Sequence, residues 1–316
     1  IIFFGVFVGI VLAIFTKKQK ENMPKSFCES HFIYGKFLDQ DEISIDEVVK
    51  NFNLLDICFE ENQLINETEY TQPALVTTCI AITKELENIG IKPNVTAGLS
   101  LGEYAALYAA GGITSMDAIT TVRKRGIFMS QAVPDNEGTM MAVLGMNKEQ
   151  VEQVISSREG VTIANYNCPG QIVITGLKDA VIMAGEKLSK AGARRTVELK
   201  VSGPFHSPYL KEAGNKLKEE LEKINLIPLE VPYIANLTAD YVDDISQTKE
   251  LLRKQVYSPV KWEQTMEKMI ADGVDTFVEI GPGRTLNGFL RKIDRTVKVY
   301  NVSKFEDIET VKEQLC

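Results

Sequence analysis

The stretch from Gly138 to Val201 limits the possible folds of this chain more than any other part of it. Runs rich in apolar and β-branched residues, typical of strands, alternate there with segments of helical length. Strands are expected at GTMMAVLG, VTIANY, QIVITG and RRTVELKV, and helices over 147–157 and 178–191. The turn NCPG separates the second and third strands. The order strand, helix, strand, strand, helix, strand predicts a small unit with its own sheet.

The chain on both sides of this unit alternates helices and strands with short turns, which is typical of an α/β protein. Helices are expected over 71–90, 209–224 and 248–255, and another helix follows that ends at 269. Strands are expected at PNVTAGLS, VPYIAN and VDTFVEIGPG. We therefore predict an α/β-hydrolase-like large domain, made of residues 46–136 and 203–316. A ferredoxin-like βαββαβ subdomain, residues 137–202, is inserted into it. A chain of 316 residues is long enough for this arrangement.

Charge and cysteine content exclude several functions. The formal net charge of −8 argues against a nucleic-acid-binding protein, because that affinity comes mainly from clustered Lys and Arg. The five cysteines are widely spaced without a CxxC pair, which indicates neither a disulfide framework nor a zinc site. We expect a reducing, cytoplasmic location and no bound metal.

The N-terminal segment, residues 1–45, does not fit this pattern. Residues 1–15 carry no charge and are followed by three lysines, as at the end of a membrane anchor or in a signal peptide. Fifteen residues are short for a membrane span, and no cleavage site follows. We expect a buried strand or an aberrant N-terminus here rather than an anchor.

The motif GLSLG, residues 98–102, matches the G-x-S-x-G nucleophile elbow, in which a tight turn between a strand and a helix exposes a serine hydroxyl. A predicted strand precedes it and an alanine-rich helix follows. The amide of Leu101 is then placed to stabilise an oxyanion. The same five residues also fit an ordinary glycine-bounded turn, so Ser100 is a candidate nucleophile that needs further support.

A serine needs a base to remove its proton, and the usual base is histidine. The chain has two histidines. His31 lies in the atypical N-terminal segment, whereas His206 lies in a short loop between prolines that leaves the inserted unit. His206 is therefore the predicted base, although a histidine in a loop is often only structural. Its orienting partner can be a backbone carbonyl instead of a carboxylate.

Arg125 is the third candidate. If Ser115 caps a helix, the spacing places Arg125 on an otherwise apolar stripe, whereas Arg123 lies nearly opposite. The stripe consists of Ala118, Val122, Arg125 and Met129. A buried guanidinium needs a negative partner, either a structural carboxylate or a ligand, and its forked geometry suits a ligand carboxylate.

Together, these features resemble the malonyl-CoA:acyl carrier protein transacylases of fatty-acid synthesis and the related acyltransferase domains of polyketide synthases. The resemblance runs from about residue 59 to about residue 293. It is carried by the motifs TQPAL, GLSLGEYAAL, RGIFMSQAVP, NYNCPGQIVITG, GPFHSPYL, QVYSPVKW and EIGPGRTLNGFL.

The resemblance implies specific roles for the candidate residues. Ser100 would form an acyl-serine, His206 would act first as general base and then as general acid, and Arg125 would bind the free carboxylate of malonyl. Gln255 matches a position in the substrate site whose backbone carbonyl orients the histidine. The form GPFHS looks like the malonyl-selecting version of the histidine motif.

Further positions follow from the same resemblance. Asn167 and Gln171 match polar positions near the substrate cleft. Arg291 and Lys292 match a basic docking site for the acidic carrier protein. The implied partners are malonyl-CoA and acyl carrier protein, with a CoA thioester as substrate and without a bound cofactor. A monomer is expected.

The N-terminus departs from the family pattern. Members begin with a strand that ends in G-Q-G-x-Q, whose first glutamine supplies an oxyanion-hole amide. This chain lacks that motif, and Gln19 is the only glutamine nearby. Two alternatives therefore stay open: a serine hydrolase or thioesterase that uses the same elbow with water, and a catalytically impaired scaffold that binds the carrier protein.

Overall fold

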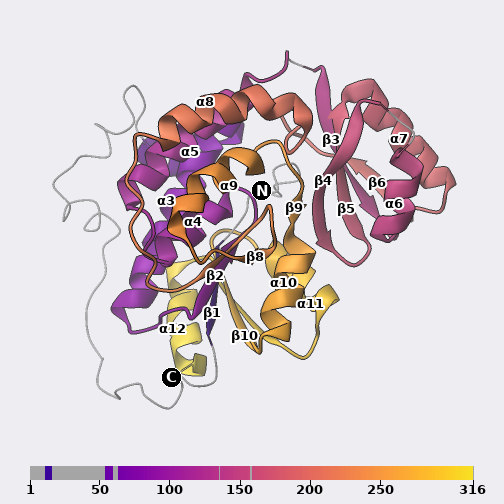
Figure 1. Ribbon diagram of the computed structural model, residues 1–316. Helices are drawn as coiled ribbons and strands as arrows, with labels where there is room; N and C mark the ends of the chain where they lie inside the picture. The colour runs from indigo at the N-terminus through magenta and orange to yellow at the C-terminus, as the bar shows by residue number, and fades with distance from the viewer. Residues whose placement is uncertain (1–10, 16–53, 60–62, 135, 157–158, 316) are drawn as a thin grey trace.

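The computed structural model describes residues 11–15, 54–59, 63–134, 136–156 and 159–315. These residues form a mixed α/β fold with two separate sheets (Figure 1). Near the start of the described chain lie a short helix α2 (Leu54–Phe59) and a 3-10 turn η3 (Leu64–Asn66), and a second such turn, η5 (Ile245–Gln247), comes later.

The larger sheet has six strands. In spatial order these are β11 (Lys298–Val302), β10 (Thr276–Ile280), β1 (Val11–Phe15), β2 (Val95–Gly98), β7 (Tyr233–Ala235) and β8 (Asp240–Tyr241). Strands β10 and β11 are parallel, as are β2 and β7, whereas β1 runs antiparallel to both of its neighbours.

The end of the uncharged N-terminal run forms a strand. Residues 11–15 make up β1 and pair with both β2 and β10 at the centre of the sheet. No helix among the described residues is long and apolar enough to span a membrane. Residues 1–10 and 16–53, which include Gln19 and His31, lie outside the described residues.

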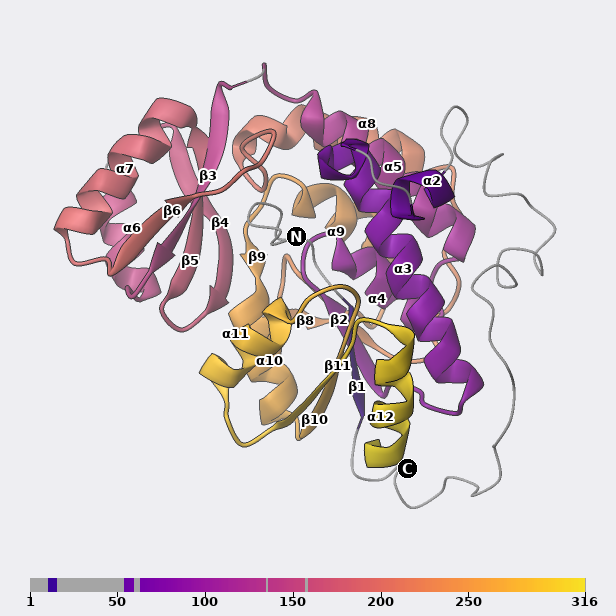
Figure 2. The ribbon, with the colours of Figure 1, turned by 180° about the vertical axis from the view of Figure 1, so that it is seen from behind.

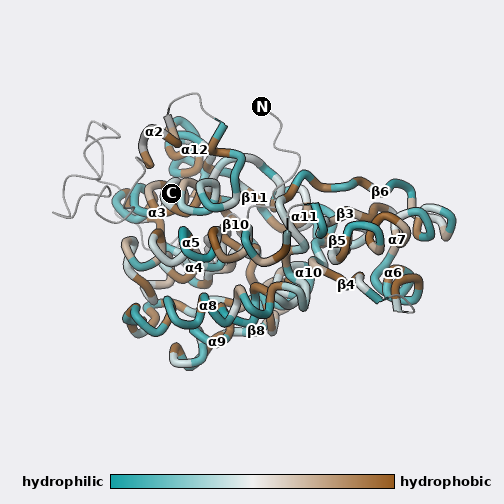
Figure 3. The backbone as a smooth tube through the Cα atoms, turned by 90° about the horizontal axis from the view of Figure 1, so that it is seen from above, coloured by the Kyte–Doolittle hydropathy of each residue, from teal (hydrophilic) through white to brown (hydrophobic). Residues whose placement is uncertain are grey.

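Helices cover both faces of this sheet (Figures 1 and 2). The core on one face contains residues of α3 (Thr68–Asn88), α4 (Gly102–Ala109), α5 (Ser115–Ser130), α8 (Lys211–Leu221), α9 (Thr248–Gln255) and α12 (Phe305–Leu315). The core on the other face contains residues of α10 (Trp262–Ala271) and α11 (Thr285–Ile293). Strand β10 contributes Phe277 to one core and Val278 to the other, because successive side chains point to opposite faces. In Figure 3, outer helices such as α7 and α8 show both hydrophilic and hydrophobic colours along their length.

The smaller sheet has the order β6 (Arg195–Glu198), β3 (Gly138–Leu144), β5 (Gln171–Leu177), β4 (Val161–Cys168) and β9 (Val260–Lys261). Helices α6 (Lys148–Ile155) and α7 (Lys178–Lys190) pack on it and enclose their own apolar core. The expected order of elements from 138 to 198 is therefore present. Strand β9 was not predicted. Its two residues, which belong to the range that we assigned to the large domain, pair with β4 and link the two parts of the chain.

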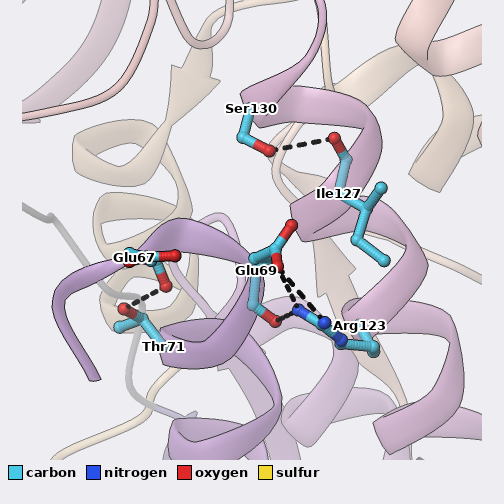
Figure 4. A network of polar contacts seen from close by, with 6 residues as sticks. All are labelled: Glu67, Glu69, Thr71, Arg123, Ile127 and Ser130. Carbon is cyan, nitrogen blue, oxygen red and sulfur yellow. Dashed lines mark hydrogen bonds and ion pairs between the residues drawn. The ribbon is translucent and has the colours of Figure 1, made fainter. Parts of the chain in front are cut away.

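Some helix boundaries differ from the predictions. Helix α3 begins at Thr68 instead of Thr71, so Pro73 lies inside it. Proline has no N–H to offer the carbonyl of Glu69 four residues earlier, and Arg123 Nη1 donates to that carbonyl at 2.6 Å (Figure 4). This contact satisfies the carbonyl that the proline leaves without a helical donor.

Two other helix starts also shift. The cap of α5 is Thr114, whose hydroxyl accepts from the N–H of Asp117, and not Ser115. The predicted helix over 209–224 begins with a 3-10 turn, η4 (Pro208–Leu210), and its α-helical part ends at Leu221.

Candidate active site

Ser100 lies in the sharp turn between β2 and α4. Its φ is +52°, in the left-handed region that non-glycine residues rarely adopt. A Cβ on Gly98 would lie 1.9 Å from the carbonyl oxygen of Gly102, so the absence of a side chain at Gly98 allows the strand and helix to approach closely. The turn therefore has the strained geometry of a nucleophile elbow.

His206 contacts the serine directly. The Ser100 Oγ lies 2.7 Å from His206 Nε2, and His206 Nδ1 lies 2.8 Å from the backbone carbonyl of Gln255. Because a carbonyl only accepts, Nδ1 carries the hydrogen and Nε2 is left to accept from the serine hydroxyl. The structure therefore brings Ser100, His206 and the Gln255 carbonyl into one hydrogen-bonded chain.

Burial and charge keep this histidine neutral. His206 is buried, and desolvation together with the nearby Arg125 charge lowers its pKa to about 4, although hydrogen bonds to backbone carbonyls oppose the shift. A neutral imidazole at neutral pH is able to take a proton from Ser100.

Arg125 is buried, and its guanidinium meets neutral oxygens. Nη1 donates to Gln72 Oε1 at 2.7 Å, and Nη2 donates to Ser100 Oγ at 3.0 Å and to Gln255 Oε1 at 3.1 Å. Among the described residues, Nε has no partner and no carboxylate forms an ion pair with this side chain. A positive charge next to the serine thus has no direct counter-ion.

A cavity of about 40 Å³ adjoins these groups and lies between the two sheets. Residues from the small sheet contribute to it alongside the serine turn. It is lined by Thr68, Gln72, Ser100, Leu101, Arg125, Met129, Met140, Asn165, Leu199, Val201, Phe205 and His206. The arrangement places a nucleophile, a base and a cation around one mostly apolar space.

Leu101 also lines this cavity. Within the described part of the chain, no acceptor bonds to its N–H, whereas the next three amides donate within the turn. This amide is therefore available to an oxyanion.

Four other predicted residues lie away from the cavity. Asn167 is buried on β4, and neither its side-chain oxygen nor its nitrogen has a partner among the described residues. Gln171 begins β5 and accepts from Lys292 Nζ at 3.0 Å. Arg291 and Lys292 are exposed in the last turn of α11. The cavity is lined instead by Asn165, two residues before Asn167 on β4, and the pairing of β4 with β5 shifts register between Tyr166 and Cys168.

Three contacting residues were not predicted. Gln72 belongs to the TQPAL motif, which was identified in the sequence without a role being assigned to this glutamine; it accepts from Arg125. Asn236 and Glu103 are buried behind Ser100 and bond to its turn and to Gln255. Burial raises the pKa of Glu103 to about 7, although hydrogen bonds from Asn236 and Gln255 oppose the shift. No pattern in a single sequence identifies either of them.

No group of three His, Cys, Asp or Glu side chains that could hold a metal ion occurs among the described residues. The site consists of a serine, a histidine, an arginine and amide groups.

Comparison with known proteins gives a consistent result. The family model described as "Acyl transferase domain" matches residues 36–312. The malonyl CoA-acyl carrier protein transacylase of Bacillus subtilis is 48% identical over 255 residues, which cover 78% of this chain and 80% of that protein. The enzyme of the same name from Staphylococcus aureus is 39% identical over 82% of this chain and 85% of its own length.

Solved structures agree. The malonyl CoA-acyl carrier protein transacylase of Clostridium perfringens superposes with a TM-score of 0.81 at 43% identity, covering 85% of this chain and 86% of that one. A malonyl-transacylase solved in complex with its type II polyketide acyl-carrier protein gives a TM-score of 0.82 at 34% identity, with 85% and 88% covered.

Proposed function

The chain belongs to the acyl transferase domain family, and we propose that it transfers a malonyl group from malonyl-CoA to the phosphopantetheine thiol of an acyl carrier protein. The observation that best supports this reaction is the chain of contacts from Gln255 O through His206 to Ser100 Oγ, with Arg125 bonded to the same oxygen. The reaction is a ping-pong acyl transfer in fatty-acid or polyketide synthesis.

In the first half-reaction, Ser100 Oγ attacks the thioester carbonyl carbon while its proton moves to His206 Nε2. The Leu101 N–H donates to the oxygen that becomes negative. The carbonyl then re-forms, the carbon–sulfur bond breaks, and the CoA thiolate takes the proton from His206. Malonyl is left as an ester on Ser100.

The second half-reaction repeats these steps with a different thiol. His206 removes the proton from the phosphopantetheine thiol of the carrier protein, and the thiolate attacks the ester carbon of malonyl-Ser100. The ester bond to Ser100 breaks, and the serine oxygen recovers the proton. The products are the malonyl thioester of the carrier protein and the free enzyme.

Arg125 selects the acyl group. Its buried charge bonds only to neutral oxygens, so the free carboxylate of malonyl would supply the missing counter-ion close to Ser100. A short neutral acyl group would leave the charge uncompensated.

Arg291 and Lys292 extend this proposal to the carrier protein. Both are exposed at the end of α11, where positive charge meets the negative end of the helix dipole. An acidic carrier would be drawn to this point despite the net charge of −8.

We further propose that the small sheet is a ferredoxin-like subdomain inserted into a hydrolase-like large domain. The strand order β6-β3-β5-β4 and the elbow between β2 and α4 support this division.

The acceptor of the malonyl group, a thiol or water, distinguishes this function from that of a hydrolase. The acylated enzyme is freed of CoA and divided between buffer alone and buffer with the carrier protein in its phosphopantetheine form. We expect the thiol to remove malonyl at least about 10²-fold faster than water does. Equal loss in both samples would establish a thioesterase instead.

A further inference from the structure

The backbone of Ser100 is held on both sides by hydrogen bonds with Asn236, Gln255 and Glu103. Its N–H donates to Asn236 Oδ1 at 2.5 Å, and its carbonyl accepts from Gln255 Nε2 at 2.9 Å and from the Glu103 N–H at 3.1 Å. A serine held at φ +52° needs such restraint, because this conformation is unfavourable for a residue with a Cβ.

Asn236 bridges the two sides of the turn. Its Nδ2 donates to the carbonyl of Gly98 at 2.7 Å, while its Oδ1 accepts from Ser100. The residue follows β7 directly, at the point where the β2–β7 ladder ends. The side-chain amide thus continues the strand pairing across the residues where the backbone leaves the sheet.

Glu103 orients both Asn236 and Gln255, the two residues whose side chains bond to the Ser100 backbone. Its Oε2 accepts from the backbone N–H of Asn236 at 3.0 Å and from Gln255 Nε2 at 2.8 Å. The carboxylate is buried, and no ion pair within 4 Å joins it to Arg125 in the described part of the chain. It acts on the site through hydrogen bonds to neighbouring amides.

The orientation of one peptide group follows from these contacts. Ser100 C=O and Leu101 N–H belong to the same trans peptide, so they point in opposite directions. With the carbonyl fixed toward Gln255 and Glu103, the Leu101 N–H must point away from them. Leu101 lines the cavity, and its amide is unbonded among the described residues.

We propose that Asn236 and Glu103 are positioning residues that lock the Ser100 turn and aim the Leu101 amide at the oxyanion. Neither residue touches the substrate. They act through the Ser100 peptide, and the proposal rests on Ser100 being the nucleophile.

The test uses a small alkyl fluorophosphonate, which needs an activated serine and an oxyanion donor but no malonyl group. Ser100 Oγ forms a bond to phosphorus, the phosphorus–fluorine bond breaks, fluoride leaves, and the serine proton passes to His206. The rate per folded molecule is measured by intact mass, together with kcat and KM for malonyl-CoA.

The expected results separate positioning from stability. Asn236→Leu and Glu103→Leu lower the phosphonylation rate and kcat about 10- to 100-fold and leave KM unchanged, because the oxyanion donor is misdirected. Glu103→Gln keeps an acceptor oxygen for both N–H groups and stays within about threefold of the parent. If a leucine variant does not fold, Asn236→Asp, which keeps the acceptor and loses the donor, takes its place with a loss of at least about fivefold.

Glu279→Leu is the matched control. Glu279 on β10 is also a buried carboxylate, and it accepts from two backbone N–H groups at the start of α11, at 3.0 and 2.8 Å. We expect it to lose stability and keep its phosphonylation rate. Asn236 and Glu103 variants that retain the parent rate overturn the proposal, and a Glu103→Gln variant as slow as Glu103→Leu overturns the hydrogen-bonding role. A parent enzyme that does not react at Ser100 contradicts the proposed function instead.

Discussion

At the scale of single residues, the proposed role of Arg125 is to select the acyl group. Arg125→Ala should lower the kcat/KM for malonyl transfer about 10²-fold, because a buried charge pair with the malonyl carboxylate is lost. Acetyl transfer should stay equal or improve, since no carboxylate is involved. The two rates are compared with malonyl-CoA and acetyl-CoA as donors.

Arg123→Ala provides the control for this prediction. Arg123 lies two residues earlier on the same helix, where it pairs with Glu69 at 3.2 Å outside the cavity. The control should leave the ratio of malonyl to acetyl transfer unchanged. If Arg125→Ala also keeps that ratio, Arg125 does not select the acyl group.

The lowered pKa of His206 leads to a prediction about the pH dependence of Ser100 acylation. The pKa of His206 lies at about 4, so the neutral form that accepts the serine proton dominates above that pH. Acylation of Ser100 should therefore lose activity only as the pH falls toward 4, and the rate at pH 5.5 should be about 97% of that at pH 7.5. A single-turnover series measures this. A rate near one tenth at pH 5.5 would mean an ordinary histidine pKa of about 6.5.

The residues that touch the reacting atoms could be predicted from the sequence because their chemistry is rare. The chain has few histidines, one serine between spaced glycines, and one arginine on an apolar helical stripe. Asn236 and Glu103 could not be predicted in this way, since an asparagine after a short strand and a glutamate in a first helical turn are common. Their roles depend on the packing of segments more than 130 residues apart.

At the scale of elements, the junction of β2 and α4 tolerates no side chain at Gly98. Gly98→Ala should lower the free energy of unfolding by about 3 kcal/mol or more and abolish acylation, because its Cβ meets the Gly102 backbone at 1.9 Å. Denaturant unfolding and adduct formation measure the two effects.

Gly288→Ala is the corresponding control on α11. Its Cβ meets nothing within 4 Å, and alanine is the better helix former. The free energy of unfolding of this variant should rise by about 0.5–1 kcal/mol, and its acylation rate should not change. A Gly98→Ala variant as stable and active as this control would contradict the tight elbow.

Periodicity predicts most elements up to β10, whereas α11, β11 and α12 were not predicted. Two other differences have clear physical causes. Pro73 suggested a helix start, but Arg123 satisfies the carbonyl that the proline leaves free. Strand β9 has only two residues, and its partner β4 lies in the other part of the chain. No local sequence pattern therefore predicts it.

At the scale of the whole molecule, the cavity lies where α3, α5 and the Ser100 turn meet the small sheet, and α11 presents its basic end away from this cavity. Charge reversal by Arg291→Glu should raise KM for the carrier protein about tenfold at low salt and less at high salt. The rate of Ser100 acylation by malonyl-CoA should not change, because that step does not involve the carrier protein.

Lys216→Glu on α8 makes the same change of net charge at an exposed position elsewhere. It should leave KM for the carrier protein within about twofold. Equal effects of the two variants would indicate a general charge effect and not a docking site.

The central claim is that Ser100 carries the malonyl group between two thiols. Intact-mass spectrometry after mixing with malonyl-CoA tests it most directly. We predict an adduct of about 86 Da that maps to Ser100, disappears when carrier protein is added, and is absent from Ser100→Ala. An enzyme that transfers malonyl without this adduct, or a Ser100→Ala variant that still forms it, would contradict the account.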